Sequence, residues 1–578
     1  MSQTMPPQSE DSEVSKRSCV RCNRRKVRCD RKQPCAQCLQ ANAECIHPGN
    51  KRAPRKLNRP PIAALRTRLQ QLEEEVERLQ AADGRSAVGS RAAHEAERPM
   101  PVDTKPLHGM LVVQDETKSR YVADDAFVFL RNKIPGLQEL YRQSWDKGHS
   151  SNSELGLDAG RSDPLQPLQM EMLWPVYKSN VAHVVTILHT SSVESVIRQA
   201  CVNPYVELDP ESDALIRAVF FAAVVSMDPA HCWSVVGDER DVCLREFRLA
   251  VERSLAKANL VCSDDIRVLQ AAVLYLLCLR CVCDSKQIWV EAAVVVRVAQ
   301  RQGIHRDGQN LGLSPFDIEM RRRLWSHICI LDILCSEDQG TDTQIRPEMF
   351  DTEPPLNIDS DDLSPTLTEL PSPQAGFTDI TLCIIQYEIM AHISWTDKSF
   401  GSGSNQSHLQ SERSSLPELA ASLEERYLQK FDLRIPIQWV TAVIFRLTLS
   451  KASLVNHLSN SAALDQESTA TDDEIFILAV EILKFSSLLQ NNEITTPWAW
   501  LCRSYKQEHA MALILSELCS RPISPETDHA WDLVKAVYDQ WQADNKINSQ
   551  MQEPVSLLME RASISRKNRA GALWGAAE

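Results

Sequence analysis

Hydrophobic positions recur every three or four residues over much of this chain, which is the period of an amphipathic helix. From about residue 165 to residue 546, long stretches of this kind alternate with polar loops and show little strand-like alternation. The clearest helices are predicted over residues 264–283 and 319–335. One face of the second helix carries Leu324, Ile328, Leu331 and Cys335. The pattern predicts a mainly α fold with a large all-helical domain over residues 165–546.

A heptad pattern occupies residues 62–80. Its apolar positions alternate in steps of three and four, and they are Ile62, Leu65, Leu69, Leu72, Val76 and Leu79. Pro60 and Pro61 suit the start of a helix, and Arg68 and Glu73 attract each other across a parallel dimer. The pattern predicts a short coiled-coil dimerisation helix, weak alone because it has under three heptads. An amphipathic helix that packs on its own chain is the alternative.

The remaining stretches lack a regular hydrophobic period. Residues 1–15 are expected to be a disordered N-terminus, 48–61 a basic, proline-rich linker, 81–164 a flexible connector and 547–578 a C-terminal tail. Inside the helical domain, residues 398–415 are serine-rich and predict a loop. Residues 346–373 contain six prolines and predict an irregular surface segment.

Charge is distributed unevenly over the 578 residues. The formal net charge is −14, but residues 16–60 hold fourteen Lys or Arg against two acidic residues, a net charge of +12 that leaves −26 for the rest. A basic head on an acidic body indicates a polyanionic partner for one end of the chain. Nucleic acid is the leading interpretation, and an anionic membrane surface is the alternative.

Composition excludes several classes of protein. The 43% hydrophobic and 24% charged residues are those of a soluble globular chain. No segment has the length and apolar character of a secretory signal or a membrane span, so no membrane partner is expected. Eighteen cysteines without such a signal indicate reduced thiols in the cytosol or nucleus, where a cysteine cluster indicates metal ligands.

Six cysteines form a regular array of two similar halves, C-x2-C-x6-C-x5-C-x2-C-x6-C. They are Cys19, Cys22, Cys29, Cys35, Cys38 and Cys45. Sulfur ligands at such spacing favour tetrahedral zinc. Two tetrahedral ions need eight ligand positions, which six sulfurs fill only if two thiolates each bridge both metals. The stoichiometry predicts a binuclear cluster of two Zn²⁺ ions over residues 16–47.

This array resembles the DNA-binding module of the fungal six-cysteine binuclear zinc-cluster transcription factors. CVRCNRRKVRC, residues 19–29, and Pro34 before Cys35 carry the resemblance. It implies that Cys19 and Cys35 are the bridging thiolates and that the short helix after Cys22 enters the major groove. It also implies that Lys26 reads a CGG-type triplet.

Side-chain chemistry agrees with this role for the basic residues of the first half. Lysine can donate to the O6 and N7 acceptors of guanine. Arg24, Arg25 and Arg28 are expected to grip phosphates of double-stranded DNA. A zinc knuckle that only contacts protein is the alternative. Downstream, a nuclear-import signal is predicted at Lys51, Arg52, Arg55 and Lys56, with a phosphate-tracking arm as its alternative.

Residues 289–332 resemble the middle homology region of the same transcription factors. The matching positions are Trp289, Ala292, Arg297, Ala299, Gly303, Ile304, His305, Arg306, Asp307, Glu319, Arg321, Arg322, Arg323, Leu324, Trp325 and Asp332. The resemblance implies an all-helical regulatory domain that controls activity and senses a small-molecule effector.

Other polar clusters in this region favour structural roles over catalysis. His305 with Asp307 and His327 with Asp332 can be acid/base pairs, but helix ends and core networks supply such neighbours routinely. Cys278, Cys281 and Cys283 are expected to be core thiols. Arg321, Arg322 and Arg323 are expected to form a solvated face or to donate ion pairs. No nucleotide-binding loop, nucleophile elbow or HExxH motif occurs, so the chain is not expected to be an enzyme.

These observations predict a nuclear, zinc-dependent, sequence-specific regulator of RNA polymerase II genes, with no catalytic residues. It is expected to bind paired CGG-like triplets as a homodimer and to contact the transcription machinery. By analogy with the family, activation and a secondary-metabolite gene cluster are expected. The alternative is a ligand-sensing scaffold or repressor whose zinc module contacts protein.

Overall fold

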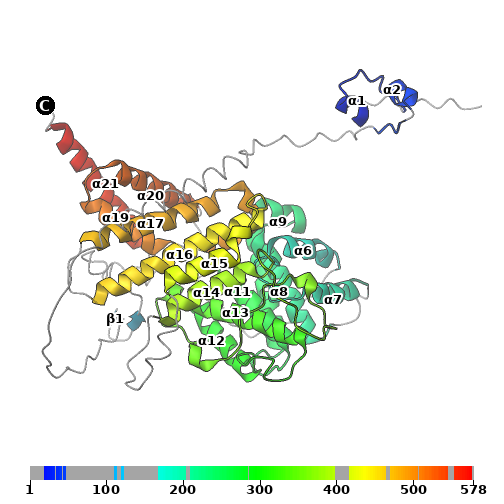
Figure 1. Ribbon diagram of the computed structural model, residues 1–578, viewed down its shortest axis with the longest axis horizontal. Helices are drawn as coiled ribbons and strands as arrows, with labels where there is room; N and C mark the ends of the chain where they lie inside the picture. The colour runs from blue at the N-terminus through cyan, green and yellow to red at the C-terminus, as the bar shows by residue number, and fades with distance from the viewer. Residues whose placement is uncertain are drawn as a thin grey trace, which may run out of the picture. The chain divides into compact units, whose positions relative to one another are not determined.

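The computed structural model describes residues 18–32, 34–41, 43–46, 110–113, 119–122, 167–202, 208–283, 285–396, 415–463, 469–504, 507–543 and 552–575. The chain divides into two compact units, residues 1–93 and 94–578. In Figure 1 the described part of the first unit is blue, and the helices of the second run from cyan to red. Each unit has its own kind of interior.

The first unit contains two one-turn helices, α1 (Val20–Arg24) and α2 (Ala36–Gln40). The backbone N–H of Val20 donates to the carbonyl oxygen of Ile46 at 2.9 Å, which joins the start of the described segment to its end. Among the described residues here, the buried side chains are Cys19, Cys22, Cys35 and Cys38. Helices this short do not persist alone, so the sulfurs organise this unit.

A strand pair lies within residues 81–164, for which the hydrophobic pattern predicted a connector. β1 (Met110–Val113) and β2 (Ser119–Val122) are antiparallel, with Met110 opposite Val122 and Val113 opposite Ser119. Four-residue strands give too short an alternation to be recognised from sequence.

Among the described residues, the first part of the helical body contains nine helices, from residue 167 to residue 396. Its helices are α6 (Pro167–Asn180), α7 (Thr190–Val202), α8 (Pro210–Ser226), α9 (Pro229–Val236), α10 (Arg240–Lys257), α11 (Ile266–Leu279), α12 (Ser285–Arg301), α13 (Pro315–Gln339) and α14 (Thr381–Thr396). Helix α8 begins at Pro210, after the Asp209 side chain accepts the N–H of Ser212. It is apolar on nearly every side and packs against α6, α10 and α11, which explains its near-complete burial.

Both helices predicted with most detail are present. Helix α11 lies inside the predicted range 264–283, and Asp265 caps its N-terminus. Helix α13 contains the predicted range 319–335, with Ser314 as its N-cap and Gly340 (φ 62°) ending it in a left-handed conformation. The predicted face is confirmed, since all four of its residues are buried, namely Leu324, Ile328, Leu331 and Cys335.

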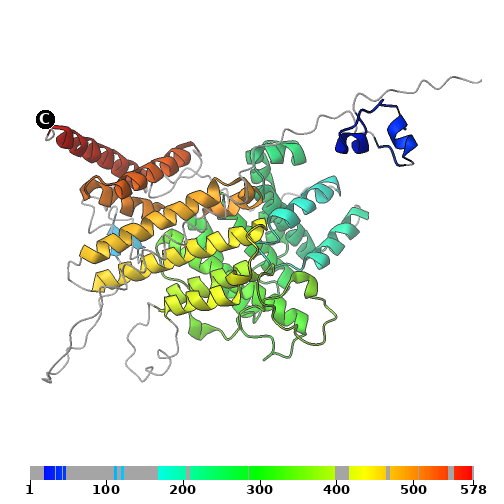
Figure 2. The ribbon, with the colours of Figure 1, turned by 45° about the horizontal axis from the view of Figure 1, so that its top comes forward.

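The second part of the body continues the helical packing to the end of the chain. Its elements are α15 (Leu416–Arg426), α16 (Pro436–Ala463), α17 (Thr469–Gln490), α18 (Ala499–Ser504), α19 (Glu508–Ser520), α20 (Pro525–Ala543) and α21 (Gln552–Gly575), with 3-10 turns Leu428–Lys430 and Glu493–Trp498. Helices α16 and α17 pack side by side, as Figure 2 shows. Helix α21 packs on α19 through Val555, Leu558 and Ala562. Within residues 547–578, expected to be a tail, α21 therefore contributes to the body.

The segment predicted as irregular, residues 346–373, contains only two 3-10 turns, Pro347–Met349 and Ser360–Asp362. Its irregularity is confirmed, but its position at the surface is wrong in part. Asn357, Ile358 and Leu363 are buried, and Ile358 and Leu363 pack with Met320 of α13. This segment is therefore part of the core of the body.

Several predictions lie outside the described residues. They are the N-terminus 1–15, the linker 48–61, the coiled-coil residues Ile62, Leu65, Leu69, Leu72, Val76 and Leu79, the import residues Lys51, Arg52, Arg55 and Lys56, and most of the loop 398–415. Within the described part of the chain, every helix is too short or too polar to traverse a lipid bilayer.

Candidate metal centre and nucleic-acid interface

The two short helices of the first unit bring six cysteine sulfurs together. Cys19 is the N-cap of α1, and its sulfur accepts the backbone N–H of Cys22 at 3.4 Å. Cys35 stands at the same place before α2, which carries Cys38. Sγ of Cys19 lies 3.7 Å from Sγ of both Cys35 and Cys38. Each pair spaced by two residues thus spans one helix start and presents both sulfurs to the same side.

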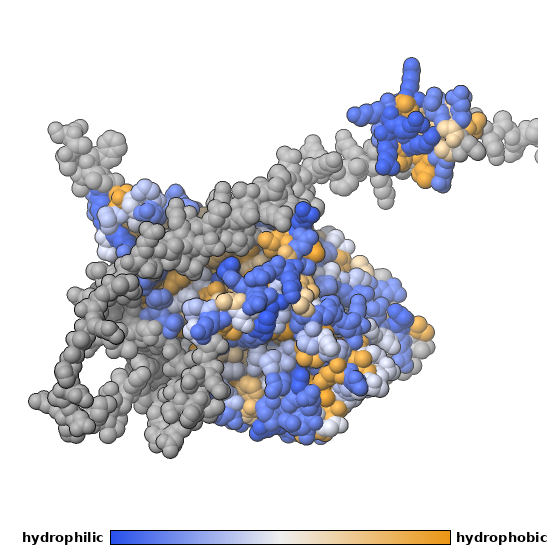
Figure 3. Space-filling model, in the orientation of Figure 1, coloured by the Kyte–Doolittle hydropathy of each residue, from blue (hydrophilic) through white to orange (hydrophobic). Residues whose placement is uncertain are grey.

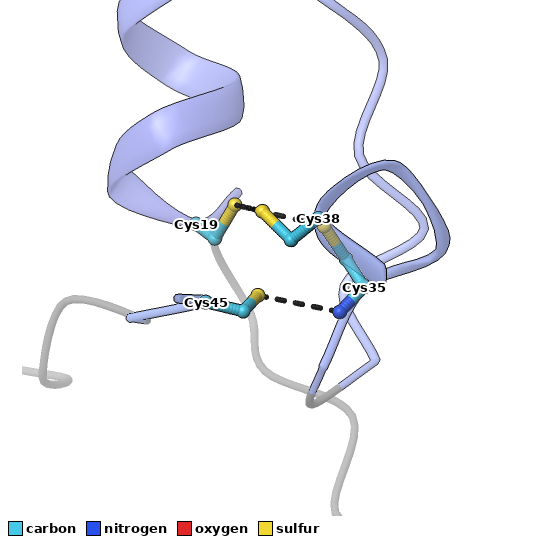
Figure 4. A group of neighbouring side chains, drawn as sticks. All are labelled: Cys19, Cys35, Cys38 and Cys45. Atoms are coloured by element: carbon cyan, nitrogen blue, oxygen red, sulfur yellow. Dashed lines mark hydrogen bonds between the residues drawn. The ribbon is translucent and has the colours of Figure 1, made fainter. Parts of the chain in front are cut away.

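The sulfurs form two overlapping groups of four, each with all atoms within 4.8 Å of one another. One group is Cys19, Cys22, Cys29 and Cys35, and the other is Cys19, Cys35, Cys38 and Cys45. Figure 4 shows the second group, with the four sulfurs directed toward one another and Cys45 accepting the N–H of Cys35 at 3.2 Å. A tetrahedron of sulfurs about 2.3 Å from zinc has edges of about 3.8 Å. The observed 3.6–3.7 Å separations fit that geometry.

The electrostatics of the array also call for a cation. Burial raises the pKa of the Cys22 thiol far above its ordinary value, and contacts with Cys19 and Cys35 add to the rise. The N–H of Cys35 favours the thiolate of Cys45, yet burial and neighbouring thiols raise its pKa to about 12. Sulfurs this crowded ionise together when a bound cation offsets their charge.

The two halves of the array repeat the same backbone hydrogen bonds with an offset of sixteen residues. The N–H of Asn23 donates to the carbonyl oxygen of Cys19, and the N–H of Leu39 donates to the carbonyl oxygen of Cys35. Likewise, the N–H of Val27 donates to the carbonyl oxygen of Cys22, and the N–H of Ala43 donates to the carbonyl oxygen of Cys38. The two halves are therefore alike in backbone, and they differ in their side chains.

The first half carries the basic side chains. Arg24, Arg25, Lys26 and Arg28 are all exposed, at the end of α1 and in the turn after it. Sixteen residues later stand Gln40, Ala41, Asn42 and Glu44. Figure 3 shows a largely hydrophilic surface on this unit. The first half of the array is therefore more basic than the second half at these equivalent positions.

Lys26 has an uncommon backbone conformation for a side-chain-bearing residue, with φ 55°. This left-handed turn ends α1 and allows the N–H of Val27 to return to Cys22. Sequence reasoning missed this feature and also missed Asp30, whose carboxylate accepts the first N–H of α2, from Ala36, at 3.1 Å. The only signal for Asp30 was its place between the two halves.

In the helical body, the residues of the middle homology region hold the irregular segment in place. The carboxylate of Asp307 accepts Nε of Arg322 at 2.8 Å and the backbone N–H of Glu353 at 3.0 Å. Only 5% of the Arg322 side chain and 4% of the Asp307 side chain are exposed. Burial opposes ionisation, but the Arg322 guanidinium and the N–H donors hold the pKa of Asp307 below its ordinary value.

A second buried ion pair continues this arrangement along α13. Nε of Arg323 lies 3.1 Å from the Glu319 carboxylate, and its other nitrogens donate to the carbonyl of Ile358 at 2.9 Å and to Ser360 at 2.7 Å. We call Asp307, Glu319, Arg322 and Arg323 the clasp. Ion-pair donation by the arginines is thus confirmed, whereas the solvated-face alternative is wrong for Arg322 and Arg323 because both are buried. Arg321 donates to the carbonyl of Gln302 at 3.2 Å.

The histidine and acid pairs considered from the sequence have structural partners. His327 Nδ1 donates to the carbonyl of Arg323 at 2.8 Å, and burial lowers its pKa to about 4. Asp332 accepts the N–H of Ile345 at 2.8 Å, and burial raises its pKa to about 6. The His305 ring lies against Trp325, while Asp307 belongs to the clasp. Each of these four side chains therefore has a partner in the core of the body or in the clasp.

Comparison with known families agrees with both regions. Residues 17–54 match the fungal Zn(2)-Cys(6) binuclear cluster domain. Residues 175–426 match the fungal specific transcription factor domain, which contains the clasp. Among the part of the chain that the structure describes, the cysteine array is the group of residues suited to a metal ion.

Individual relatives are fungal regulators. The chain is 30% identical to the aurofusarin cluster transcription factor aurR2 of Gibberella zeae over 64% of its length and 55% of that protein. It is 26% identical to the pyriculol/pyriculariol biosynthesis cluster transcription factor 1 of Pyricularia oryzae over 84% of its length and 69% of that protein. It is 25% identical to the transcriptional regulator AacuB of Aspergillus aculeatus, over 63% of its length and 50% of that protein. The chain therefore spans about half to two thirds of these relatives, and its residues 17–54 and 175–426 are similar to the two domains found in fungal Zn(2)-Cys(6) transcription factors.

Proposed function

We propose that the chain is a sequence-specific DNA-binding regulator of RNA polymerase II genes whose first unit reads DNA around two zinc ions. One observation carries the proposal: two sulfur tetrads share Cys19 and Cys35 beneath a turn of exposed basic residues. The sulfurs of Cys22 and Cys29 would complete one tetrad, and those of Cys38 and Cys45 the other. Zinc here supplies cross-links and charge compensation, which fix the fold of the basic turn.

Lys26 is proposed to read a base, and Arg24, Arg25 and Arg28 to bind phosphates. The ammonium group of Lys26 can donate to O6 and N7 of guanine. The arginines on either side lie on the same exposed turn and match the charge of the backbone. Because these four side chains are exposed, they contribute to binding without holding the module together.

We also propose that two copies bind paired CGG-like triplets. The support is the heptad pattern of residues 62–80, preceded by a linker of fourteen residues, 48–61, that can span up to about 50 Å when extended. Each copy would then read one triplet. The basic cluster Lys51, Arg52, Arg55 and Lys56 supports nuclear import.

The genetic role proposed is activation of a secondary-metabolite gene cluster through contacts with the transcription machinery. The names of the Gibberella zeae and Pyricularia oryzae relatives each refer to such a cluster. The body, which matches the fungal specific transcription factor domain, is the proposed site of control by a small-molecule effector.

Binding-site selection from random DNA, with the full chain and zinc at two salt concentrations, tests the proposal. We expect enrichment of paired triplets at one fixed spacing, and affinity that falls steeply with salt because phosphate contacts release counterions. Lys26→Ala should remove the enrichment and leave residual, salt-dependent binding. Glu44→Ala, at the second-half position equivalent to Arg28, is the matched control and should keep the same site.

Failure would take a recognisable form. A lack of any enriched sequence with intact zinc content would contradict direct reading of DNA. Binding of a single triplet would contradict the dimer but leave the reading by Lys26 in place. Binding indifferent to salt would favour the alternative of a ligand-sensing scaffold or repressor whose zinc module contacts protein.

A further inference from the structure

Two cysteines lie in the turn that follows α11. Cys281 and Cys283 are both partly exposed, whereas Cys278 in the last turn of α11 is fully buried. The expectation that all three are core thiols is therefore right for Cys278 only. Cys281 donates weakly to the carbonyl of Leu277, with its sulfur 3.5 Å from that oxygen.

Helix α10 supplies a cation to one of these thiols. Nη1 of Arg248 lies 3.3 Å from Sγ of Cys283. The other guanidinium nitrogens are engaged, since Nε donates to Glu252 at 2.7 Å and Nη2 donates to Gln287 at 3.3 Å. Tyr275 donates to the same Glu252 carboxylate at 2.6 Å, which fixes that group in turn. One N–H of the guanidinium is thus held against the sulfur.

The charges facing this sulfur favour its ionised form. Among the described residues, the acidic groups that interact with Arg248 are Glu252, which is shared with Tyr275, and Glu291, whose pKa is raised by burial. Burial opposes the charge of Arg248, but Glu252, Tyr275 and Cys283 raise its pKa. Interaction energies are reciprocal, so the same contact that stabilises the guanidinium stabilises a Cys283 thiolate.

We propose that Cys283 is a reactive thiolate that hydroperoxides oxidise and that Cys281 then resolves. The Cys283 sulfur attacks the distal oxygen of the hydroperoxide, the O–O bond breaks, and sulfenic acid and an alcohol or water result after one proton is taken up. The Cys281 sulfur then displaces hydroxide from the sulfenic acid, and a disulfide and water form. Overall, two thiols lose two hydrogens and one peroxide is reduced.

The location gives this chemistry a structural readout. The turn joins α11 to α12, and Arg248 reaches it from α10, so oxidation removes the thiolate that the guanidinium contacts. The contact pairs residues 35 positions apart in sequence, which explains why the cysteines alone predicted inert core thiols.

The test is the oxidation rate of each cysteine in the zinc-loaded full chain at pH 7. Hydrogen peroxide is the oxidant, dimedone traps sulfenic acid, and peptide mass spectrometry locates the products. Exposed Cys262 serves as the internal comparison. We expect Cys283 to react about threefold faster than Cys262, because the contact with Arg248 increases the fraction of thiolate, while a stabilised thiolate is a somewhat weaker nucleophile. The native chain should yield the Cys281–Cys283 disulfide, and Cys281→Ser should accumulate the dimedone adduct at Cys283.

Variants at Arg248 separate activation from folding. Arg248→Gln should remove this rate advantage, and Arg248→Lys should restore part of it, with unchanged thermal unfolding of the body as the check on structure. The proposal is overturned if Cys262 reacts as fast as Cys283, or if Arg248→Gln leaves the Cys283 rate unchanged. A Cys283 sulfenic acid that accumulates in the native chain would overturn the role of Cys281.

Discussion

The two units of this chain bury different kinds of groups. The described residues of the zinc-cluster module bury four cysteines, whereas the body buries aliphatic and aromatic side chains around a few charged ones. Burial of apolar surface is favourable by itself. Crowded sulfurs, in contrast, hold a fold together only around a cation. The comparison teaches that metal should control the structure of one unit and leave the other unchanged.

Removal of zinc should have the largest effect, because it should unfold the first unit and leave the body folded. A chelator, or Cys35→Ser, is expected to abolish specific DNA binding and to expose residues 17–54 to protease, because Cys35 belongs to both sulfur tetrads. The body should keep its thermal unfolding transition. Cys278→Ser, in a buried thiol of the body, is the matched control and should leave the zinc content unchanged. Loss of the body's transition on chelation would contradict the separation of the two units.

A second experiment removes one charge of the clasp and should destabilise the body alone. Arg323→Met leaves the buried Glu319 carboxylate without its partner, which should destabilise the body by about 3–5 kcal/mol. The double variant Glu319→Leu with Arg323→Met should recover much of this loss, since no charge is then stranded. Urea unfolding measures both. Zinc content and the protease resistance of residues 17–54 should not change.

Two variants of Lys26 separate base discrimination from resistance to chelation in the first unit. Lys26→Ala and Lys26→Asn should each lose about 1–3 kcal/mol of discrimination for guanine. Asparagine adopts a left-handed backbone more readily than alanine, so Lys26→Asn should resist chelation better. Binding to point-mutated sites measures the first effect, and competition with a chelator measures the second. Equal resistance of the two variants would show that the φ of 55° costs nothing.

The native chain should show the smallest effect, because two pH dependences in the body offset each other. His327 is buried and has a pKa of about 4. Its contribution to the free energy of unfolding decreases as pH falls from about 6.5 to 4, because the histidine takes up a proton in the unfolded chain first. Asp332, with a pKa of about 6, does the reverse over nearly the same window. The two contributions offset each other in the native chain.

Substitution of one partner should uncover this balance. As pH falls from 6.5 to 4, the free energy of unfolding of Asp332→Asn should decrease by up to about 1.4 kcal/mol per pH unit. That of His327→Gln should increase by a similar amount. Urea unfolding at several pH values gives both slopes. Parallel slopes in the two variants would contradict the assignment.

Local patterns in the sequence predicted the features that depend on residues close together in the chain. The periodic apolar positions of α11 and α13 gave both helices, and the cysteine spacing gave the two-part array. What the sequence could not give depends on distant partners. Ile358 packs with Met320 of α13, and Arg323, thirty-five residues earlier, donates to its carbonyl oxygen, whereas proline content alone indicated a surface segment. Helix α21 was missed because its burial depends on α19.

The exposed basic turn on a sulfur-held scaffold has a consequence for evolution. Substitutions of exposed side chains usually change stability by less than about 0.5 kcal/mol. Arg24, Arg25 and Arg28 can therefore be exchanged without the risk of unfolding that accompanies a change in the clasp. A gene duplicate of such a regulator can change its affinity for DNA in single steps, each of which yields a folded protein.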